Sequence, residues 1–250
     1  MITSLDKNIV ILTHLGVGDH ISVHSAVLKI YHDTPKFNNM YIIVKENAVR
    51  NLQFMYRNLN KIKFLTVPNN SSTTSPEVQK HLNNFKESII YNCWWYNTND
   101  IKYSDECIMT SLGYSYEDKY NFFKIDRDFD REEEVFNKVV GNNDPYIFVA
   151  DDPLRNYILD PFKISKFKKD IKVIKSCDLL DYSMFDLLSV IEKAKETHVM
   201  HSAFFLLIDH MSLNKIYLHN SYLTRLKINP LESYEKTMQN YLNNRNITYV

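Results

Sequence analysis

Residues 8–24 of the chain read NIVILTHLGVGDHISVH, and they predict a strand, a glycine turn and a helix in direct succession. The apolar run from Ile9 to Leu12 is typical of a buried strand. Gly16 and Gly18 are two of only four glycines in the chain, and they favour a tight turn that another molecule can approach. From Ile21 onward, apolar residues recur at helical spacing. The turn should therefore lie at the carboxyl end of a strand, where open α/β sheets bind ligands.

Asp19 immediately precedes the predicted helix, and its side chain suits the N-cap position, where carboxylate oxygens accept hydrogen bonds from unpaired N–H groups. An ordinary strand-turn-helix with a capping Asp is one interpretation of this stretch. A ligand-binding turn is the other, and a single Gly-x-Gly pattern does not decide between them.

The same alternation continues through the first half of the chain. Further strands are expected at residues 41–44, 62–67 and 88–91, and helices at 47–59, 77–87 and 101–112, with Ser75 as N-cap, Pro76 at the first helical position and Gly113 as C-cap. Residues 68–76 read as an exposed loop. Strands that alternate with helices indicate a parallel sheet.

Residues 114–130 lack a clear period and are expected to connect two halves. In the second half, strands are expected at 146–150, 171–174, 197–200 and 215–218, the last of them taken as the final strand, with an extended arm at 157–159. Helices are expected at 131–140, at 183–195 with Ser183 as N-cap, at 201–209 and at 231–244. The predicted fold class is therefore α/β, with two Rossmann-like parallel-sheet halves that face a cleft: a domain over residues 1–120 and a second over 121–250, whose final helix crosses back.

Composition narrows the class of protein. Thirty basic residues balance thirty acidic ones, and no dense basic stripe is visible, so nucleic acid is not an expected partner. Three cysteines without a Cys-x-x-Cys pair indicate free thiols in a reducing, cytoplasmic compartment. The N-terminus does not read as a signal peptide, and no apolar run reaches the roughly 20 residues of a transmembrane segment.

The sequence from His14 to His20, with its Gly-Asp pair after the first strand, resembles the N-terminal signature of GT-B glycosyltransferases of the heptosyltransferase-like kind and of related small viral and bacterial transferases. The resemblance implies that Asp19 is the base that activates an acceptor hydroxyl, with His20 or His14 as a less favoured base. It also implies that the first half binds the acceptor, through His14, Gly16 and Gly18.

The segment from Glu192 to Phe204 resembles the same family's donor half, where a strand leads into a small-residue turn and a helix N-terminus points at the donor's diphosphate. Free N–H groups and the helix dipole favour an anion there. The expected donor-binding residues are His201, Ser202, Ala203, Phe204 and, after the next strand, His219. A capping Ser and a buried His form the alternative interpretation.

Two further groups follow strands. Trp94 and Trp95 either pack a domain interface or form an aromatic platform for the acceptor's sugar ring. Asp151 and Asp152 follow the strand at 146–150. Because adjacent carboxylates without a third partner make a poor metal site, no metal is expected, and Asp151 and Arg155 are placed in the donor site instead.

The leading hypothesis is a metal-independent, inverting glycosyltransferase. It needs no cofactor, takes a nucleotide-sugar as co-substrate, and transfers the sugar to a glycan or other hydroxyl acceptor. The second hypothesis is a non-catalytic nucleotide- or glycan-binding module of the same fold. An NAD-dependent oxidoreductase is disfavoured, because Ile21 stands where a dinucleotide-binding turn has its third glycine.

Overall fold

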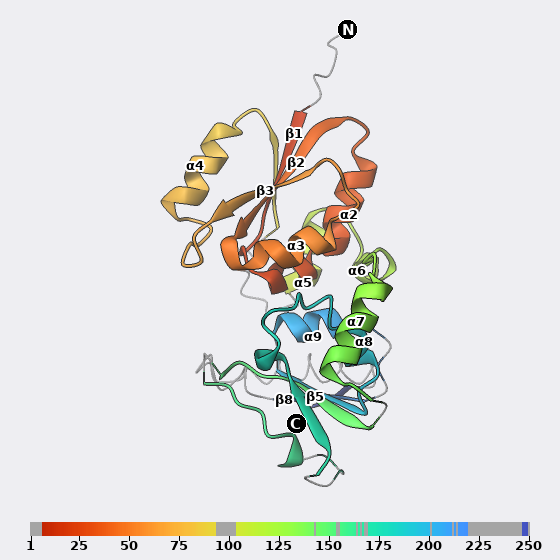
Figure 1. Ribbon diagram of the computed structural model, residues 1–250. Coiled ribbons are helices and arrows are strands. Elements are labelled where there is room, and N and C mark those ends of the chain that lie inside the picture. Colours follow the sequence, from red (N-terminus) through yellow and green to blue (C-terminus); the bar gives the residue numbers. More distant parts are fainter. Residues whose placement is uncertain are drawn as a thin grey trace. The chain divides into compact units, whose positions relative to one another are not determined.

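The computed structural model describes residues 7–93, 104–142, 144–153, 156–163, 165, 167, 170–200, 202–211, 213, 215–219 and 247–249, with the backbone alone at 104–107 and 249. The chain divides into two compact units, residues 1–126 and 127–250. The division falls within the segment expected to connect two halves. Each unit is built around its own parallel sheet (Figure 1).

The first unit holds a four-stranded sheet in the order β3-β2-β1-β4. All its strand pairs are parallel. The strands are β1 (Lys7–Leu12), β2 (Phe37–Lys45), β3 (Ile62–Val67) and β4 (Ile89–Asn92). Five longer helices accompany them: α1 (Val17–Ser22), α2 (His24–Asp33), α3 (Val49–Met55), α4 (Pro76–Asn84) and α5 (Ser104–Ser111). The described residues of this unit also include a 3₁₀ turn, η1 (Glu46–Ala48), and the short α6 (Asp118–Asn121).

Period-two alternation in β1 gives each face of this sheet its own cover. Val10 and Leu12 pack on one face with Val78 of α4, while α2 and α3 lie on the other side of the sheet (Figure 1). Both faces are therefore apolar, as a parallel sheet between two helix layers requires. Because β1 lies between β2 and β4, the turn that follows it is anchored in the middle of the sheet.

The second unit holds a five-stranded sheet in the order β6-β5-β7-β8-β9, also with parallel pairs throughout. Its strands are β5 (Tyr146–Ala150), β6 (Lys172–Lys175), β7 (Glu196–Met200), β8 (Ile216–His219) and β9 (Ile247–Tyr249). Its helices are α7 (Phe129–Val139), α8 (Leu188–Glu192) and α9 (Ala203–Ile208), with 3₁₀ turns η3 (Pro161–Lys163) and η4 (Ser176–Asp178).

Burial and packing explain why this second sheet forms. Every residue of β5 and β7 is buried. Ile147 and Val149 pack on one face with Leu159, and Phe148 contacts Phe204 of α9, with ring centroids 5.8 Å apart, on the other. The segment expected as an arm at 157–159 forms a single antiparallel bridge, between Asp152 and Tyr157.

Three local predictions were wrong. The helix expected over 183–195 is confined to α8: Ser183 is not its N-cap, because residues 184–187 form a turn and the helix begins only at Leu188. The helix after β1 is broken at Val23 into α1 and α2. A further strand, β9, pairs with β8, so the strand at 216–219 is not the last. The helix expected at 231–244 lies outside the described residues.

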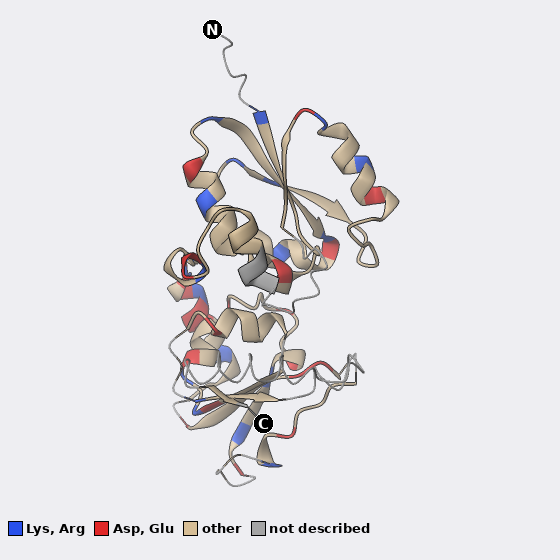
Figure 2. Ribbon diagram, turned by 180° about the vertical axis from the view of Figure 1, so that it is seen from behind, with Lys and Arg blue, Asp and Glu red and all other residues tan. Residues whose placement is uncertain are grey.

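Neither sign of charge forms a continuous stripe on the described ribbon, where basic and acidic residues are scattered through both units (Figure 2). Within the described ranges, no helix combines the length and the apolar character that crossing a membrane would need.

Candidate active site

The turn after β1 is held by hydrogen bonds from both of its sides. The Leu15 N–H donates to Thr13 Oγ1 at 2.9 Å, and the Leu15 carbonyl accepts from the Lys45 N–H at 3.1 Å. Leu15, not a glycine, takes the left-handed conformation, with φ of 76°. Such a conformation costs a bulky residue on the order of 1–3 kcal/mol. Complete burial of the Leu15 side chain in the core offsets that cost.

Asp19 is the third residue of α1, and Gly16 is the N-cap. This corrects the expectation that Asp19 itself caps the helix. The Gly16 N–H donates to Asp19 Oδ2 at 3.0 Å, so the carboxylate folds back over the turn. It accepts from the N-cap N–H of α1, as the third helical residue does in a capping box. Asp19 is half-buried, and its orientation is fixed by this bond.

The electrostatic surroundings of Asp19 suit a group that exchanges protons. Burial raises the pKa of the Asp19 carboxyl above its ordinary value, although His14, the Gly16 N–H and Lys45 act in the opposite direction. Catalytic bases are commonly adjusted in this way, because a carboxylate of raised pKa accepts a proton more readily near neutral pH. Lys45, the half-buried last residue of β2, was not among the predicted site residues. Its only signal in the sequence is a charge at the end of a buried strand.

His20 and His14 have different surroundings. The His20 side chain is completely buried, its Nε2 lies 3.1 Å from Thr13 Oγ1, and burial lowers its pKa to about 3. A neutral, enclosed imidazole of this kind supports the turn and has no surface for an acceptor to contact. His14 is exposed and is one of the charges near Asp19. Trp94 and Trp95 lie outside the described residues.

In the second unit, three of the expected donor residues lie at the start of α9. Ser202 is the N-cap, and its side chain makes no capping hydrogen bond. Ser202, Ala203 and Phe204 are all half-buried. His201 and Arg155 lie outside the described residues. The helix behind this turn is only six residues long.

Asp151 follows β5 at the carboxyl edge of the second sheet. Its side chain is 1% exposed, and Oδ2 lies 3.6 Å from Lys175 Nζ. Oδ1 is buried and has no hydrogen-bond partner among the described residues. Across the same described part of the chain, no three His, Cys, Asp or Glu side chains gather as a metal site would require.

His219 ends β8, and the strand register pairs it with Met200, the last residue of β7. It therefore lies at the carboxyl edge of the sheet, opposite Met200, which precedes Ser202 by two residues in the sequence. Its Nε2 lies 2.9 Å from His198 Nδ1. Sequence reasoning missed His198, because a histidine within a strand carries no local sign of its partner on the next strand.

No family model and no curated protein sequence matches this chain. Among solved structures, the glycosyl transferase family 9 protein from Veillonella parvula DSM 2008 is similar, with a TM-score of 0.55 and 12% identity over 87% of this chain and 81% of that one. The heptosyltransferase WaaC of E. coli, solved with ADP-2-deoxy-2-fluoro heptose, gives a TM-score of 0.43 and 9% identity over 97% and 92% of the two chains.

The first similarity establishes a class of fold. The chain has the α/β architecture of a GT-B glycosyltransferase, with two Rossmann-like parallel sheets, as the sequence predicted. One solved structure with this architecture that it resembles is the family 9 glycosyl transferase.

Proposed function

We propose that this chain is a glycosyltransferase that moves a sugar from a nucleotide-sugar donor to a hydroxyl group of a glycan or other acceptor. One observation carries the proposal. In a chain with this fold, the only carboxylate of the β1 turn is half-buried and fixed over the turn by the Gly16 N–H, and burial raises its pKa. Carboxyl ends of parallel strands are where such folds bind ligands.

In the proposed reaction, the first unit binds the acceptor and Asp19 takes its hydroxyl proton. The acceptor oxygen forms a bond to the anomeric carbon as the bond from that carbon to the diphosphate oxygen breaks, and the nucleoside diphosphate leaves with the electron pair. A single carboxylate base suits this direct displacement, so the product is inverted at the anomeric carbon.

The second unit is proposed to bind the nucleotide-sugar at the carboxyl ends of β5, β7 and β8. In this proposal the turn at Ser202–Phe204 faces the diphosphate, and Asp151 lies toward the nucleoside. His201 and Arg155 are outside the described residues and stay predicted members of the donor site. Fixed hydrogen-bond donors at such a turn stabilise the charge that develops on the leaving diphosphate.

The test is a panel of UDP-, GDP- and ADP-sugars offered to the wild-type protein and to Asp19→Asn, with nucleotide release and donor binding measured separately. Asp19→Asn should keep donor binding and lose about 10²–10⁴-fold in turnover, the usual contribution of a general base. Donor binding without turnover in the wild-type protein, across the panel, would favour the alternative of a non-catalytic binding module.

A further inference from the structure

Five side chains form one row across β7 and β8. Glu196 and His198 are two apart on β7 and share a face of the sheet, as do Tyr217 and His219 on β8, with Lys215 immediately before that strand. The Tyr217 ring stacks on His198 with centroids 4.7 Å apart. The row runs from the amino end of the sheet to its carboxyl edge.

The polar members of this row are joined end to end. Lys215 Nζ donates to Glu196 Oε1 at 2.7 Å, and Glu196 Oε2 lies 3.4 Å from His198 Nε2. His198 Nδ1 then lies 2.9 Å from His219 Nε2. Glu196 and His198 are almost completely buried, whereas Lys215 and His219, at the two ends, are half-buried. Solvent and ligands can therefore reach only the ends of the chain.

Burial and hydrogen bonding determine the protonation states of Glu196, His198 and His219. Burial acts to raise the pKa of Glu196, but hydrogen bonds from Lys215, Ser165 and His198 outweigh it, so the pKa is lowered and the carboxyl is ionised. Burial lowers the pKa of His198, against the pull of Glu196. Burial and the neighbouring His198 lower the pKa of His219 to about 4. At neutral pH, Glu196 is thus a carboxylate, and His198 and His219 are neutral imidazoles.

This arrangement fixes the direction of every hydrogen bond. An ionised carboxylate only accepts, so His198 Nε2 must carry the proton that points at Glu196. A neutral imidazole carries one ring proton, which leaves His198 Nδ1 as an acceptor, and His219 Nε2 must donate to it. The remaining nitrogen of His219, Nδ1, is therefore unprotonated.

We infer that His219 Nδ1 is a hydrogen-bond acceptor at the carboxyl edge of the second sheet, and that it accepts a hydrogen bond from a hydroxyl group of the nucleotide-sugar. The row of hydrogen bonds that begins at Lys215 determines which nitrogen of His219 is the acceptor. This inference rests on the proposed function for the identity of its ligand. The diphosphate of a nucleotide-sugar is esterified at both ends and carries no proton at neutral pH, so the lone pair of Nδ1 repels its oxygens. His219 is thereby assigned to a ribose or sugar hydroxyl rather than to the diphosphate, and His198 becomes a positioning residue.

The hydrogen-bond directions can be measured without any ligand. Long-range ¹H–¹⁵N correlation spectra of the free protein distinguish protonated from unprotonated ring nitrogens. We expect both His198 and His219 to be neutral at pH 7 with the proton on Nε2. A proton on Nδ1 of His219, or a charged His219 at pH 7, would overturn the inference.

Replacing the carboxylate tests its control over the chain. In Glu196→Gln, the amide oxygen accepts from Lys215 and the amide N–H₂ then faces His198 Nε2. The proton of each histidine should move to Nδ1, and His219 should present a donor instead. Glu133→Gln, at an exposed position of α7, removes the same charge and should leave both tautomers unchanged. Unchanged tautomers in Glu196→Gln would contradict the assignment.

The ligand assignment is tested by calorimetric binding to wild-type protein and His219→Phe. The probes are ADP, UDP, their 2′- and 3′-deoxy counterparts, the matching nucleotide-sugars and inorganic pyrophosphate. We expect His219→Phe to lose about tenfold in affinity, the worth of one hydrogen bond. The loss should vanish for a deoxy counterpart if the hydroxyl is on ribose, and appear only with nucleotide-sugars if it is on the sugar.

An equal loss for pyrophosphate would place the diphosphate on His219 and overturn the assignment. Failure of wild-type protein to bind any nucleotide would instead overturn the proposed function and with it the ligand assigned to His219. The spectra of the free protein test the protonation of His198 and His219 without any ligand, so the two failures are distinguishable.

Discussion

The backbone N–H of Gly16 donates to Oδ2 of Asp19 over 3.0 Å, and this bond ties the glycine turn to the carboxylate that follows it. A Cβ atom added to Gly16 would lie 2.9 Å from the same oxygen. The turn thus accommodates the folded-back carboxylate only because residue 16 has no side chain.

Gly16→Ala should displace the Asp19 carboxylate and remove this hydrogen bond. The φ of Gly16 is −87°, which alanine adopts without strain, so the cost arises from the contact alone. We expect a loss of about 1 kcal/mol in unfolding free energy, measured by urea denaturation. The same change in an Asp19→Ala background is the control and should cost clearly less; equal costs in both backgrounds would contradict the contact as the cause.

Asp19→Asn should stabilise the protein while it abolishes the proposed proton transfer. The folded-state pKa of Asp19 is raised above its ordinary 3.8, so the folded chain holds a proton that the unfolded chain releases, and stability falls as pH rises through that window. Asparagine carries no such penalty and still accepts from the Gly16 N–H. Calorimetry should give a higher Tm for Asp19→Asn at pH 7, with the difference shrinking toward pH 3; a lower Tm at pH 7 would show that burial does not penalise this carboxylate.

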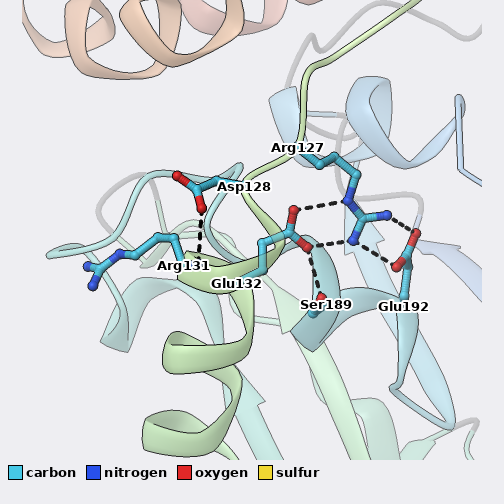
Figure 3. Close-up of polar contacts among 6 residues, drawn as sticks. All are labelled: Arg127, Asp128, Arg131, Glu132, Ser189 and Glu192. Carbon is cyan, nitrogen blue, oxygen red and sulfur yellow. Dashed lines mark hydrogen bonds and ion pairs between the residues drawn. The ribbon is translucent and has the colours of Figure 1, made fainter.

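Arg127 joins the start of the second unit to α8, and its loss should destabilise that unit strongly (Figure 3). It bonds to both oxygens of Glu132, whose side chain is 0% exposed, and to both oxygens of Glu192. Arg127→Ala leaves Glu132 buried with Ser189 as its remaining side-chain partner in Figure 3. Removing one partner of a buried ion pair costs about 3–5 kcal/mol, measurable by chemical denaturation.

Arg131→Ala is the matched control for that experiment. Arg131 pairs with Glu134 at 2.7 Å, but their side chains are 36% and 65% exposed, and solvent-exposed pairs of this kind contribute little to stability. Similar losses for the two arginine variants would show that burial does not set the strength of the Arg127 pairs.

Acid should destabilise the first unit through His24. Its Nε2 donates to the Lys124 carbonyl at 2.8 Å, and burial lowers its pKa from the ordinary 6.5 to about 4. Between these values the unfolded chain binds a proton that the folded chain does not, so stability falls as pH falls, by about 1.4 kcal/mol per pH unit for this histidine. In His24→Gln, denaturation at pH 7 and pH 5 should reveal a smaller loss than in wild-type protein. His32→Gln, at an exposed position of α2, should match wild-type protein.

Transfer should survive EDTA. Asp151 pairs with Lys175, the Asp152 backbone is paired with Tyr157, and the described residues offer no group of three ligands. Dialysis against EDTA, followed by the donor panel with and without added Mg²⁺ or Mn²⁺, should give equal rates. A strict metal requirement would direct attention back to Asp151 and Asp152.

Much of the fold was predictable because its signals are local. The apolar runs at 62–67 and 146–150 match β3 and β5 residue for residue, and Ser75-Pro76 begins α4 as its pattern predicts. The predicted helix over 183–195 was too long, because residues 184–187 form a turn and α8 begins only at Leu188. Side-chain periodicity does not distinguish such a turn from the first turn of a helix.

The candidate site was predictable only in part. The sequence identified the turn at Gly16 and Asp19, since glycines and a carboxylate after a buried strand are a contiguous signal. Lys45 was missed because only the fold brings it near Asp19. His198 and Glu196 were missed because their partners His219 and Lys215 lie on or just before the neighbouring strand. Trp94, Trp95, His201 and Arg155 stay predictions, since they lie outside the described residues.

The sequence by itself determined strands β1 to β8 and the turns that follow them, because side-chain period and turn chemistry depend on neighbours in the sequence. Only the tertiary structure decided what meets at those ends. The left-handed residue of the β1 turn is Leu15, with its side chain held in the core. His198 and His219 are 21 residues apart and form one hydrogen-bonded pair, because the parallel register of β7 and β8 places them on the same face. Strand register and burial are set by contacts between residues that are far apart in the sequence, so the local sequence around each residue does not predict them.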